Sequence, residues 1–273
     1  MNYETVIKYL DQTRDFLENA INLSKIEVYT GQFSKESIFN TDFFTHCQVK
    51  PDTQEDKGAK WLLPPDCNLI CYKSTEDGNC LFNSVSLLIF GNEELAMQLR
   101  FATIIELMKY ARHYLNIPIF KKSIIYSDLA FQTAEKFNDK EKEFDKQFVF
   151  IQELHLMCNI GNWCGMPALY GLSSVLQHNI RSIFPPIKQK LLIDTYNKVI
   201  EPRQDSDNGS QLETDRNPQE IDRESQQQNS DYEPINILWT NMSVTNKQKA
   251  TKFLKSNLIC TNHFVPCHKK AQT

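Results

Sequence analysis

The sequence predicts an α+β fold, a small sheet with helices on its faces, and three features lead to this prediction. Apolar residues recur at helical spacing through much of the first two thirds of the chain. A polar loop runs into an apolar helix at Cys80, and His263 lies in an apolar segment near the end. Short apolar or alternating segments indicate strands at residues 180–183, 235–239 and 258–266.

The first 58 residues are predicted to form an N-terminal helical extension. Residues 3–23 place apolar side chains on one side of a helix, whereas residues 25–58 follow no regular pattern. The helix either packs on the main domain or offers a surface to a partner, and the sequence leaves both open. We place the main domain at residues 59–268 and a tail at residues 269–273.

The main domain begins with helices and ends with strands. A helix at residues 93–115 follows a stop signal at Gly91. Further helical patterns cover residues 126–137, 140–158 and 166–177, and the one at residues 126–137 is the weakest. Residues 191–200 are predicted to form another strand.

An acidic insert interrupts the domain at about residues 201–233. It contains ten acidic and three basic residues, a net charge of −7, so the rest of the chain carries +3 of the total of −4. Large apolar residues are scarce in it, and burial therefore cannot offset the entropy lost on ordering. We predict that the insert is disordered. A charge of +3 spread over a whole domain does not form the basic patch of a nucleic-acid-binding protein. We therefore expect no nucleic-acid partner.

Composition indicates one packed core in an intracellular protein. Of the 273 residues 41% are hydrophobic, enough for one substantial core. The chain opens without a signal-peptide pattern, and no apolar run approaches the roughly 20 residues of a membrane span. We therefore expect reduced cysteines, a cytoplasmic or nuclear location and no membrane partner. The eight cysteines contain no Cys-x-x-Cys pair, so no metal site is expected.

The loop around Gly78 has the composition of a nucleophile loop. Asp77, Gly78 and Asn79 are turn and cap residue types, and they place Cys80 in the first turn of an apolar helix. The helix dipole and the free N–H groups there favour a thiolate and lower a cysteine pKa. Amides around Asn79 and Cys80 are candidates for binding an oxyanion.

This loop resembles the nucleophile motif of the OTU (ovarian tumour) family of cysteine proteases, whose members are mostly deubiquitinases. Further segments resemble the family in the same order along the chain. Residues 161–163 (GNW) and the helix after them are similar to its tryptophan loop, and residues 261–266 (TNHFVP) to its histidine strand. The similarity covers roughly residues 60–268, and it is greatest to a divergent OTU-like group that includes vertnin-type proteins.

The resemblance implies an OTU-like cysteine protease fold and a set of catalytic residues. Cys80 would be the nucleophile and His263 its general acid and base. Asp77 matches a position often assigned as catalytic, or else it only caps the helix. Some relatives carry an acid or amide two positions after the histidine, where this chain has Val265. Trp163 either walls the substrate cleft or fills the core.

Another departure from the family lies inside the nucleophile helix, where relatives often carry a larger basic residue in place of Asn83. The function implied by the resemblance is a cofactor-free isopeptidase that acts on conjugates of ubiquitin or a ubiquitin-like modifier. The alternative is an inactive OTU-like scaffold of transposon-derived type, retained for binding or regulation. The sequence leaves the oligomeric state open.

Overall fold

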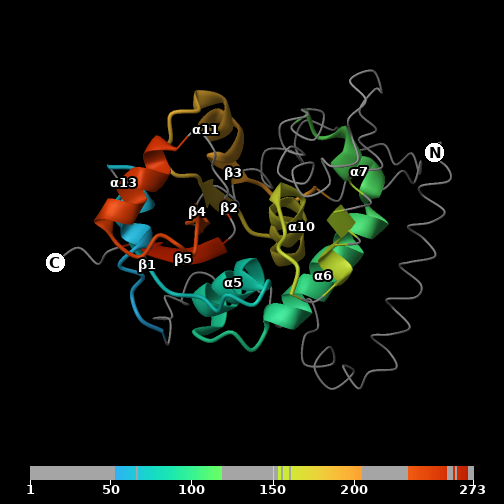
Figure 1. Ribbon diagram of the computed structural model, residues 1–273. Helices are drawn as coiled ribbons and strands as arrows, with labels where there is room; N and C mark the ends of the chain where they lie inside the picture. Colours follow the sequence, from blue (N-terminus) through green and yellow to red (C-terminus); the bar gives the residue numbers. More distant parts are fainter. Residues whose placement is uncertain are drawn as a thin grey trace, which may run out of the picture.

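The computed structural model describes residues 53–65, 67–118, 150, 153–154, 156–159, 161–204, 233–256, 261 and 263–269 (Figure 1). In chain order the elements are η1 (Ala59–Leu62), β1 (Leu69–Cys71), α5 (Cys80–Phe90), α6 (Ala96–Lys109), α7 (Ala111–Asn116), α10 (Met166–Leu176), β2 (Ile180–Ile183), α11 (Lys190–Tyr196), β3 (Lys198–Ile200), β4 (Ile235–Thr240), α13 (Lys247–Lys255) and β5 (His263–Lys269). Helices and a mixed sheet occur together, so the predicted α+β class is confirmed.

Five strands form the sheet in the order β1-β5-β4-β2-β3. Strand β5 is antiparallel to both of its neighbours, and the pair formed by β2 and β4 is parallel. All six residues of β4 are buried, as expected for a central strand covered on both faces. The strand that carries His263 therefore lies next to the centre of the sheet.

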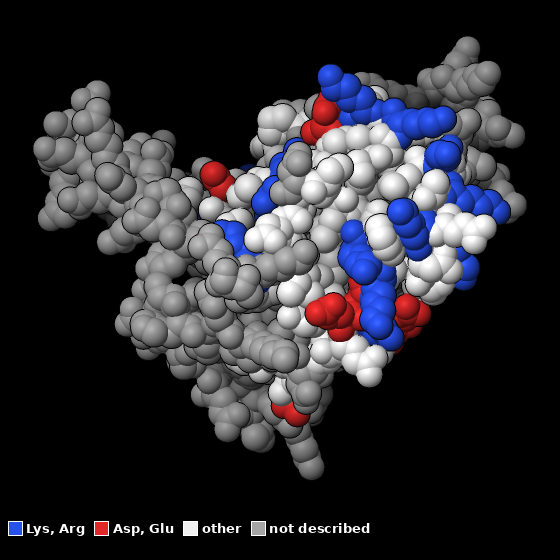
Figure 2. Space-filling view, turned by 90° about the vertical axis from the view of Figure 1, so that its left-hand side faces the viewer, with Lys and Arg blue, Asp and Glu red and all other residues white. Residues whose placement is uncertain are grey.

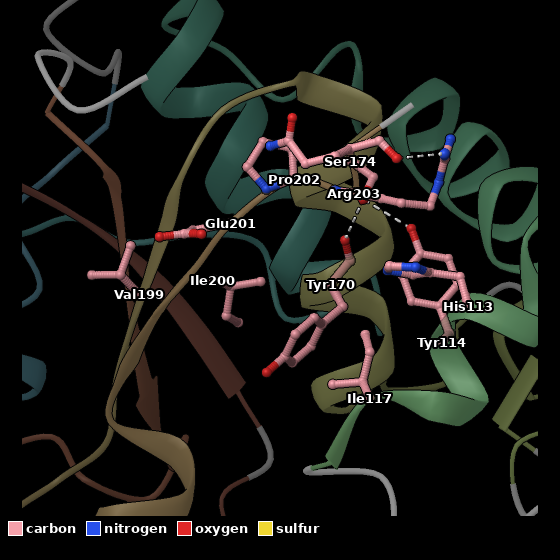
Figure 3. Close-up of a pocket in the computed structure, with 11 residues that line it drawn as sticks. His113, Tyr114, Ile117, Tyr170, Ser174, Val199, Ile200, Glu201, Pro202 and Arg203 are labelled. Atoms are coloured by element: carbon pink, nitrogen blue, oxygen red, sulfur yellow. Dashed lines mark hydrogen bonds between the residues drawn. The ribbon is translucent and has the colours of Figure 1, made fainter. Parts of the chain in front are cut away.

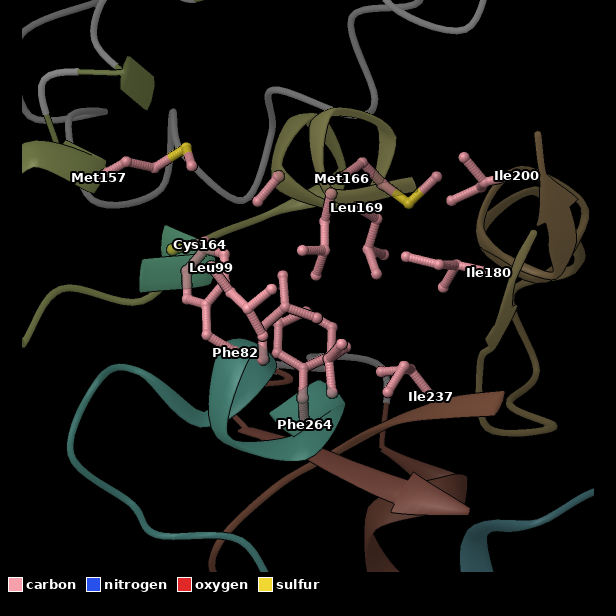
Figure 4. Close-up of a cluster of buried hydrophobic side chains, with 14 of the residues drawn as sticks. Phe82, Leu99, Met157, Cys164, Met166, Leu169, Ile180, Ile200, Ile237 and Phe264 are labelled. Carbon is pink, nitrogen blue, oxygen red and sulfur yellow. The ribbon is translucent and has the colours of Figure 1, made fainter. Parts of the chain in front are cut away.

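Helices α5 and α10 cover one face of the sheet, and α6 packs on these two helices. Figure 4 shows Phe82 of α5, Leu169 of α10 and Phe264 of β5 pointing into one apolar cluster, and all three are completely buried. Gly91 ends α5 in the left-handed conformation, with φ of 82°, and its N–H donates to Leu87 O. This confirms the predicted stop signal.

The opposite face packs against η1 and α13 through a smaller cluster that includes Leu62, Leu238 and Val265. Helix α13 carries lysines and no acidic residue, and Lys and Arg side chains gather on this side of the molecule (Figure 2). Two lysines contact the Trp61 ring, with Lys60 Nζ 5.0 Å and Lys247 Nζ 5.1 Å from the ring centroid. None of the helices in the described ranges is long and apolar enough to cross a lipid bilayer.

The elements agree with the prediction where the periodicity is strong. Helix α10 and strands β2 and β4 lie where they were expected, whereas the described β5 covers His263–Lys269 instead of residues 258–266. The helix predicted at residues 93–115 is divided at Tyr110 into α6 and α7. The helices predicted at residues 3–23 and 126–137, and most of the helix at 140–158, fall outside the described residues.

Several elements differ from the prediction, and η1 and β1 were not predicted. Residues 191–200 form all but the first residue of α11, and then strand β3, rather than one strand, because a short apolar run is compatible with either structure. Helix α13 was not predicted, since lysines hide its few apolar positions. Its start was readable, because the Asn246 side chain caps it by accepting a hydrogen bond from Lys249 N–H at 3.0 Å.

Packing contacts also involve residues just before the predicted domain start at residue 59 and at the start of the insert predicted at about residues 201–233. Asp56 N–H donates to Cys71 O at 2.8 Å, so the chain already runs beside β1 before residue 59. At the other end Arg203 is 6% exposed and pairs with Glu106 at 3.0 Å. The first residues of the predicted insert are therefore packed, and residues 205–232 lie outside the described ranges. Lys269, assigned to the tail, pairs with Leu69 as part of β5.

Candidate active site

Cys80 is the first residue of α5, as predicted. The loop before it turns at Gly78, whose φ is +83°, and the first hydrogen bond of the helix runs from Asn83 N–H to Asn79 O at 2.8 Å. Cys80 is 2% exposed, and its thiol lies beside the backbone N–H of Phe264 in β5. The structure thus brings the nucleophile loop to the start of the histidine strand.

The expected lowering of the Cys80 pKa is wrong for this arrangement. Burial raises the pKa of the thiol to about 12, although N–H groups of Phe264, Leu81 and Cys80 itself favour the thiolate. The negative charge of Asp77 raises the pKa further. The loss of water around a buried thiolate therefore outweighs the helix N-terminus. In this closed arrangement Cys80 is a neutral thiol.

His263 is the first residue of β5 and is 3% exposed. Its Nε2 lies 3.3 Å from Ser74 Oγ, and within the described structure its buried Nδ1 has no hydrogen-bond partner. Burial lowers the pKa of the ring to about 4, while the charges of Asp56 and Asp77 oppose this shift. The imidazole is therefore neutral at physiological pH.

The ring and the thiol are not hydrogen-bonded to each other in the described structure. No hydrogen bond joins the described side chains of Cys80 and His263, although the thiol lies beside the peptide between His263 and Phe264. Strand alternation directs the side chains of His263 and Val265 to one face and that of Phe264 to the other. Val265 is buried and apolar, so it offers no polar group to the ring.

Asp77 organises its own loop. Its Oδ1 accepts hydrogen bonds from Asn79 N–H at 2.8 Å and from Asn83 Nδ2 at 3.0 Å. Its carboxylate does not hydrogen-bond to His263 among the described contacts, and it acts on the ring only through its charge. The geometry fits a residue that holds the loop. Asn83, a departure from the family pattern, is the partner that makes this contact.

In the predicted oxyanion loop Asn79 is buried and Gly78 is half-buried. The Asn79 N–H is already bonded to Asp77, whereas the N–H of Cys80 lies beside its own thiol. A Cβ atom on Gly78 would lie 2.0 Å from Gly161 O, so this loop packs directly on the predicted tryptophan loop. Of the two amides proposed for an oxyanion, that of Cys80 is the better placed.

Arg100 of α6 is the main residue that sequence reasoning missed. It is completely buried, and its five N–H groups donate to five oxygens. The Nη1 contacts Gly78 O at 3.0 Å and Asn79 Oδ1 at 2.7 Å, Nη2 contacts Asn159 O at 3.0 Å and Asn162 O at 2.9 Å, and Nε contacts Met157 O at 2.8 Å. Arg100 therefore ties the nucleophile loop to residues 157–162. A signal existed, because Arg100 lies on the apolar stripe of α6 with Ala96 and Ile104.

Trp163 packs in the core beside the site. Its ring stacks on Phe264 with centroids 5.4 Å apart and meets Trp239 edge-on at 5.6 Å. It is half-buried, and within the described structure its buried Nε1 has no hydrogen-bond partner. These contacts match the packing role that the sequence left open, and they place Trp163 against the aromatic neighbour of His263.

Two hollows lie on the described surface near these elements. One of about 370 Å³ is lined in part by Ser74, Thr75 and Glu93, so it reaches the serine that contacts His263. The other, of about 390 Å³, lies between α7, α10 and β3 (Figure 3). Tyr114, Ser174 and Arg203 surround it, and none of the predicted site residues lines it.

Two cysteines face each other across the sheet, and neither belongs to a metal site formed by described residues. Cys71 and Cys267 face each other across β1 and β5, with their Sγ atoms 3.0 Å apart. Both thiols are free and buried. Among the described residues no group of three or more histidine, cysteine or acidic side chains is arranged to hold a metal ion.

Comparison with known proteins agrees with the sequence motifs. The family model for the OTU domain of vertnin matches residues 72–214, just over half of the chain. The match includes Cys80 and Trp163, whereas His263 lies beyond it.

Individual relatives are similar over a limited length. The chain is 29% identical to human vertnin over 154 residues, covering 54% of this chain and 22% of vertnin. It is 29% identical to the zebrafish (Danio rerio) protein over 152 residues, covering 54% of this chain and 22% of the zebrafish protein. The giant panda (Ailuropoda melanoleuca) protein is 28% identical over 205 residues, covering 71% of this chain and 28% of the panda protein. The chain thus spans less than a third of the length of these vertnins.

Among solved structures, the OTU domain of OTUD1 is 16% identical with a TM-score of 0.37, covering 78% of this chain and 92% of that one. The viral OTU domain protease from Farallon virus is 14% identical with a TM-score of 0.35, covering 81% of this chain and 99% of the viral protease chain. The sequence match to the family model decides the assignment. The chain belongs to the vertnin OTU domain family.

Proposed function

We propose that this domain is a thiol-dependent isopeptidase that removes ubiquitin or a ubiquitin-like modifier from its conjugates. The observation that carries the proposal is the position of the Cys80 thiol, at the start of α5 and beside the backbone N–H of the residue after His263. Three N–H groups near the sulfur favour a thiolate once water or substrate reaches it.

The proposed reaction needs only side chains of this chain and water. His263 takes the proton of Cys80, and the thiolate attacks the carbonyl carbon of the isopeptide bond. The Cys80 N–H stabilises the oxyanion, and the imidazolium gives its proton to the departing lysine amine as the C–N bond breaks. Water then attacks the thioester with His263 as base, which releases the modifier and restores the thiol.

The closed arrangement is not the reactive one. Because burial raises the pKa of the thiol and lowers the pKa of the ring, proton transfer from Cys80 to His263 is unfavourable in this arrangement. Substrate binding must therefore open the site and bring the ring to the sulfur. Catalytic hydrogen bonds that tighten only in the substrate complex are common in hydrolases.

A fluorogenic amide at the ubiquitin C-terminus tests the proposal. We expect hydrolysis by the wild-type chain and none by Cys80→Ser or His263→Ala when both variants remain folded. The second candidate is an OTU-like scaffold that binds without turnover, and Val265 favours it because it leaves no acid or amide two residues after His263. Binding of ubiquitin without hydrolysis would select that candidate.

A further inference from the structure

The contacts of the Ser74 hydroxyl determine which ring nitrogen of His263 carries a proton. A serine hydroxyl has one hydrogen to donate, and Ser74 Oγ donates it to Phe264 O at 2.7 Å. The oxygen can then only accept from Nε2 of His263, which lies 3.3 Å away. Since a neutral imidazole carries one proton, this proton is on Nε2 and the lone pair is on Nδ1.

We propose that Ser74 is the positioning residue of the catalytic histidine and takes the place that an acid or amide fills in other OTU domains. The inference rests on the proposed function. By holding the proton on Nε2, Ser74 leaves Nδ1 as the nitrogen that takes the proton of Cys80. Orienting groups in other hydrolases likewise hold one ring nitrogen so that the opposite one faces the nucleophile.

The fold builds this contact from segments far apart in the sequence. The chain leaves β1 beside β5, where Tyr72 N–H donates to Pro266 O at 2.9 Å, and two residues later it brings Ser74 to the start of β5. Ser74 is 8% exposed, so little water competes with the contact. Within the described structure Nδ1 is buried without a partner, as expected of a base whose substrate-bound partner is absent.

A second serine supplies a matched control. Ser84, one turn after Cys80 in α5, donates to the same Phe264 carbonyl at 3.1 Å but makes no described contact with the ring. Removal of either hydroxyl weakens the hold on the Phe264 carbonyl. Only the Ser74→Ala change also removes the hydrogen-bond acceptor of the His263 Nε2–H.

The test combines nitrogen NMR of His263 with capture by a ubiquitin probe that carries a C-terminal electrophile. In ¹⁵N-histidine-labelled chain at pH 7.5, where the ring is neutral, the wild type and Ser84→Ala should show a protonated Nε2 and an unprotonated Nδ1. Ser74→Ala should shift both signals towards a tautomer mixture, and Ser74→Thr, which keeps the hydroxyl, should restore them. Probe capture by Ser74→Ala should fall about 10–100-fold, and Ser74→Thr should recover most of it.

Ring signals that do not change in Ser74→Ala, or a wild-type ring protonated on Nδ1, would overturn the assignment. Equal shifts in Ser74→Ala and Ser84→Ala would also overturn it, because the effect would then come from the Phe264 carbonyl. If the wild type captures no probe, the proposed function fails while the NMR comparison still decides the role of Ser74. Thermal unfolding of each variant confirms that folded protein is compared.

Discussion

Gly78 and Gly161 pack backbone to backbone, and this contact fixes the loop that presents Cys80. A Cβ on Gly78 would lie 2.0 Å from Gly161 O, whereas a Cβ on Gly161 would come no nearer than 3.7 Å to Asp77 O. Both glycines have positive φ, +83° and +92°. They therefore share a conformational requirement and differ in the space available.

This difference predicts unequal effects of two alanine substitutions. Gly161→Ala should cost about 1 kcal/mol of unfolding free energy, the usual penalty for a side chain at positive φ. Gly78→Ala should cost clearly more, because the two loops must also move apart. Urea unfolding of both variants measures the contrast. Equal losses would mean that the loops are not packed as described.

Arg100 should control the reactivity of Cys80 beyond its effect on stability. Lysine has three donors on a flexible stem and cannot replace the planar group that makes five hydrogen bonds. In Arg100→Lys we expect the loop to open more often, so that alkylation of Cys80 by iodoacetamide in folded protein rises by at least about tenfold. Peptide mass spectrometry at Cys80 gives the rate.

Arg203→Lys is the matched control, since Arg203 is also buried but pairs with Glu106 away from the nucleophile loop. Its alkylation rate should stay near that of the wild type at a similar loss of stability. The same acceleration in both variants would assign the effect to general destabilisation.

Stability should fall in mild acid because of His263. Burial lowers the pKa of its ring from the ordinary 6.5 to about 4 in the folded chain, so between these limits only the unfolded chain takes up the proton. The contribution of this ring is constant above pH 6.5 and declines as pH falls, by about 3 kcal/mol at pH 4.

The difference in unfolding free energy between wild type and His263→Gln, measured in urea from pH 7.5 to 4.5, isolates this effect. His178, whose pKa burial also lowers, is present in both proteins and cancels. The glutamine variant should lose less stability in acid. Parallel pH curves would show that the ring of His263 is not buried as a neutral group.

Asp77 and Asn83 should act as one unit. Asp77→Ala removes the acceptor of Asn79 N–H and of Asn83 Nδ2, and we expect a loss of about 0.5–2 kcal/mol, as for other lost caps. Asn83→Ala breaks the same contact from the other side, so the double variant should lose less than the sum of the two. Additive losses would argue against the shared contact. Turnover that falls further in folded Asp77→Ala than in Asn83→Ala would indicate that its charge also supports the ring of His263.

The sequence was most informative where local patterns decide structure. The turn at Gly78, the helix start at Cys80, the stop at Gly91 and the strand of His263 all follow from neighbouring residues. The α+β class followed from the same patterns, and the match to the OTU family model agrees with the motif at Cys80.

Sequence reasoning failed where distant segments decide the environment. The helix start predicted a low thiol pKa, but the packing of β5 over α5 buries Cys80 and reverses the shift. The contact between Ser74 and His263 depends on how β1 lies beside β5, and no local pattern distinguishes Ser74 from any serine before a turn. Arg100 was recognisable only as a charge on an apolar stripe.

Reaction with a ubiquitin probe carrying a C-terminal electrophile is the most direct test of the central claim, that Cys80 is the nucleophile of a ubiquitin-directed isopeptidase. We predict one covalent adduct per chain, located at Cys80 by peptide mass spectrometry, absent in Cys80→Ala and strongly reduced in His263→Ala. None of the other described cysteines begins a helix, and they serve as internal controls. No adduct from folded protein, or an adduct that persists in Cys80→Ala, would contradict the claim.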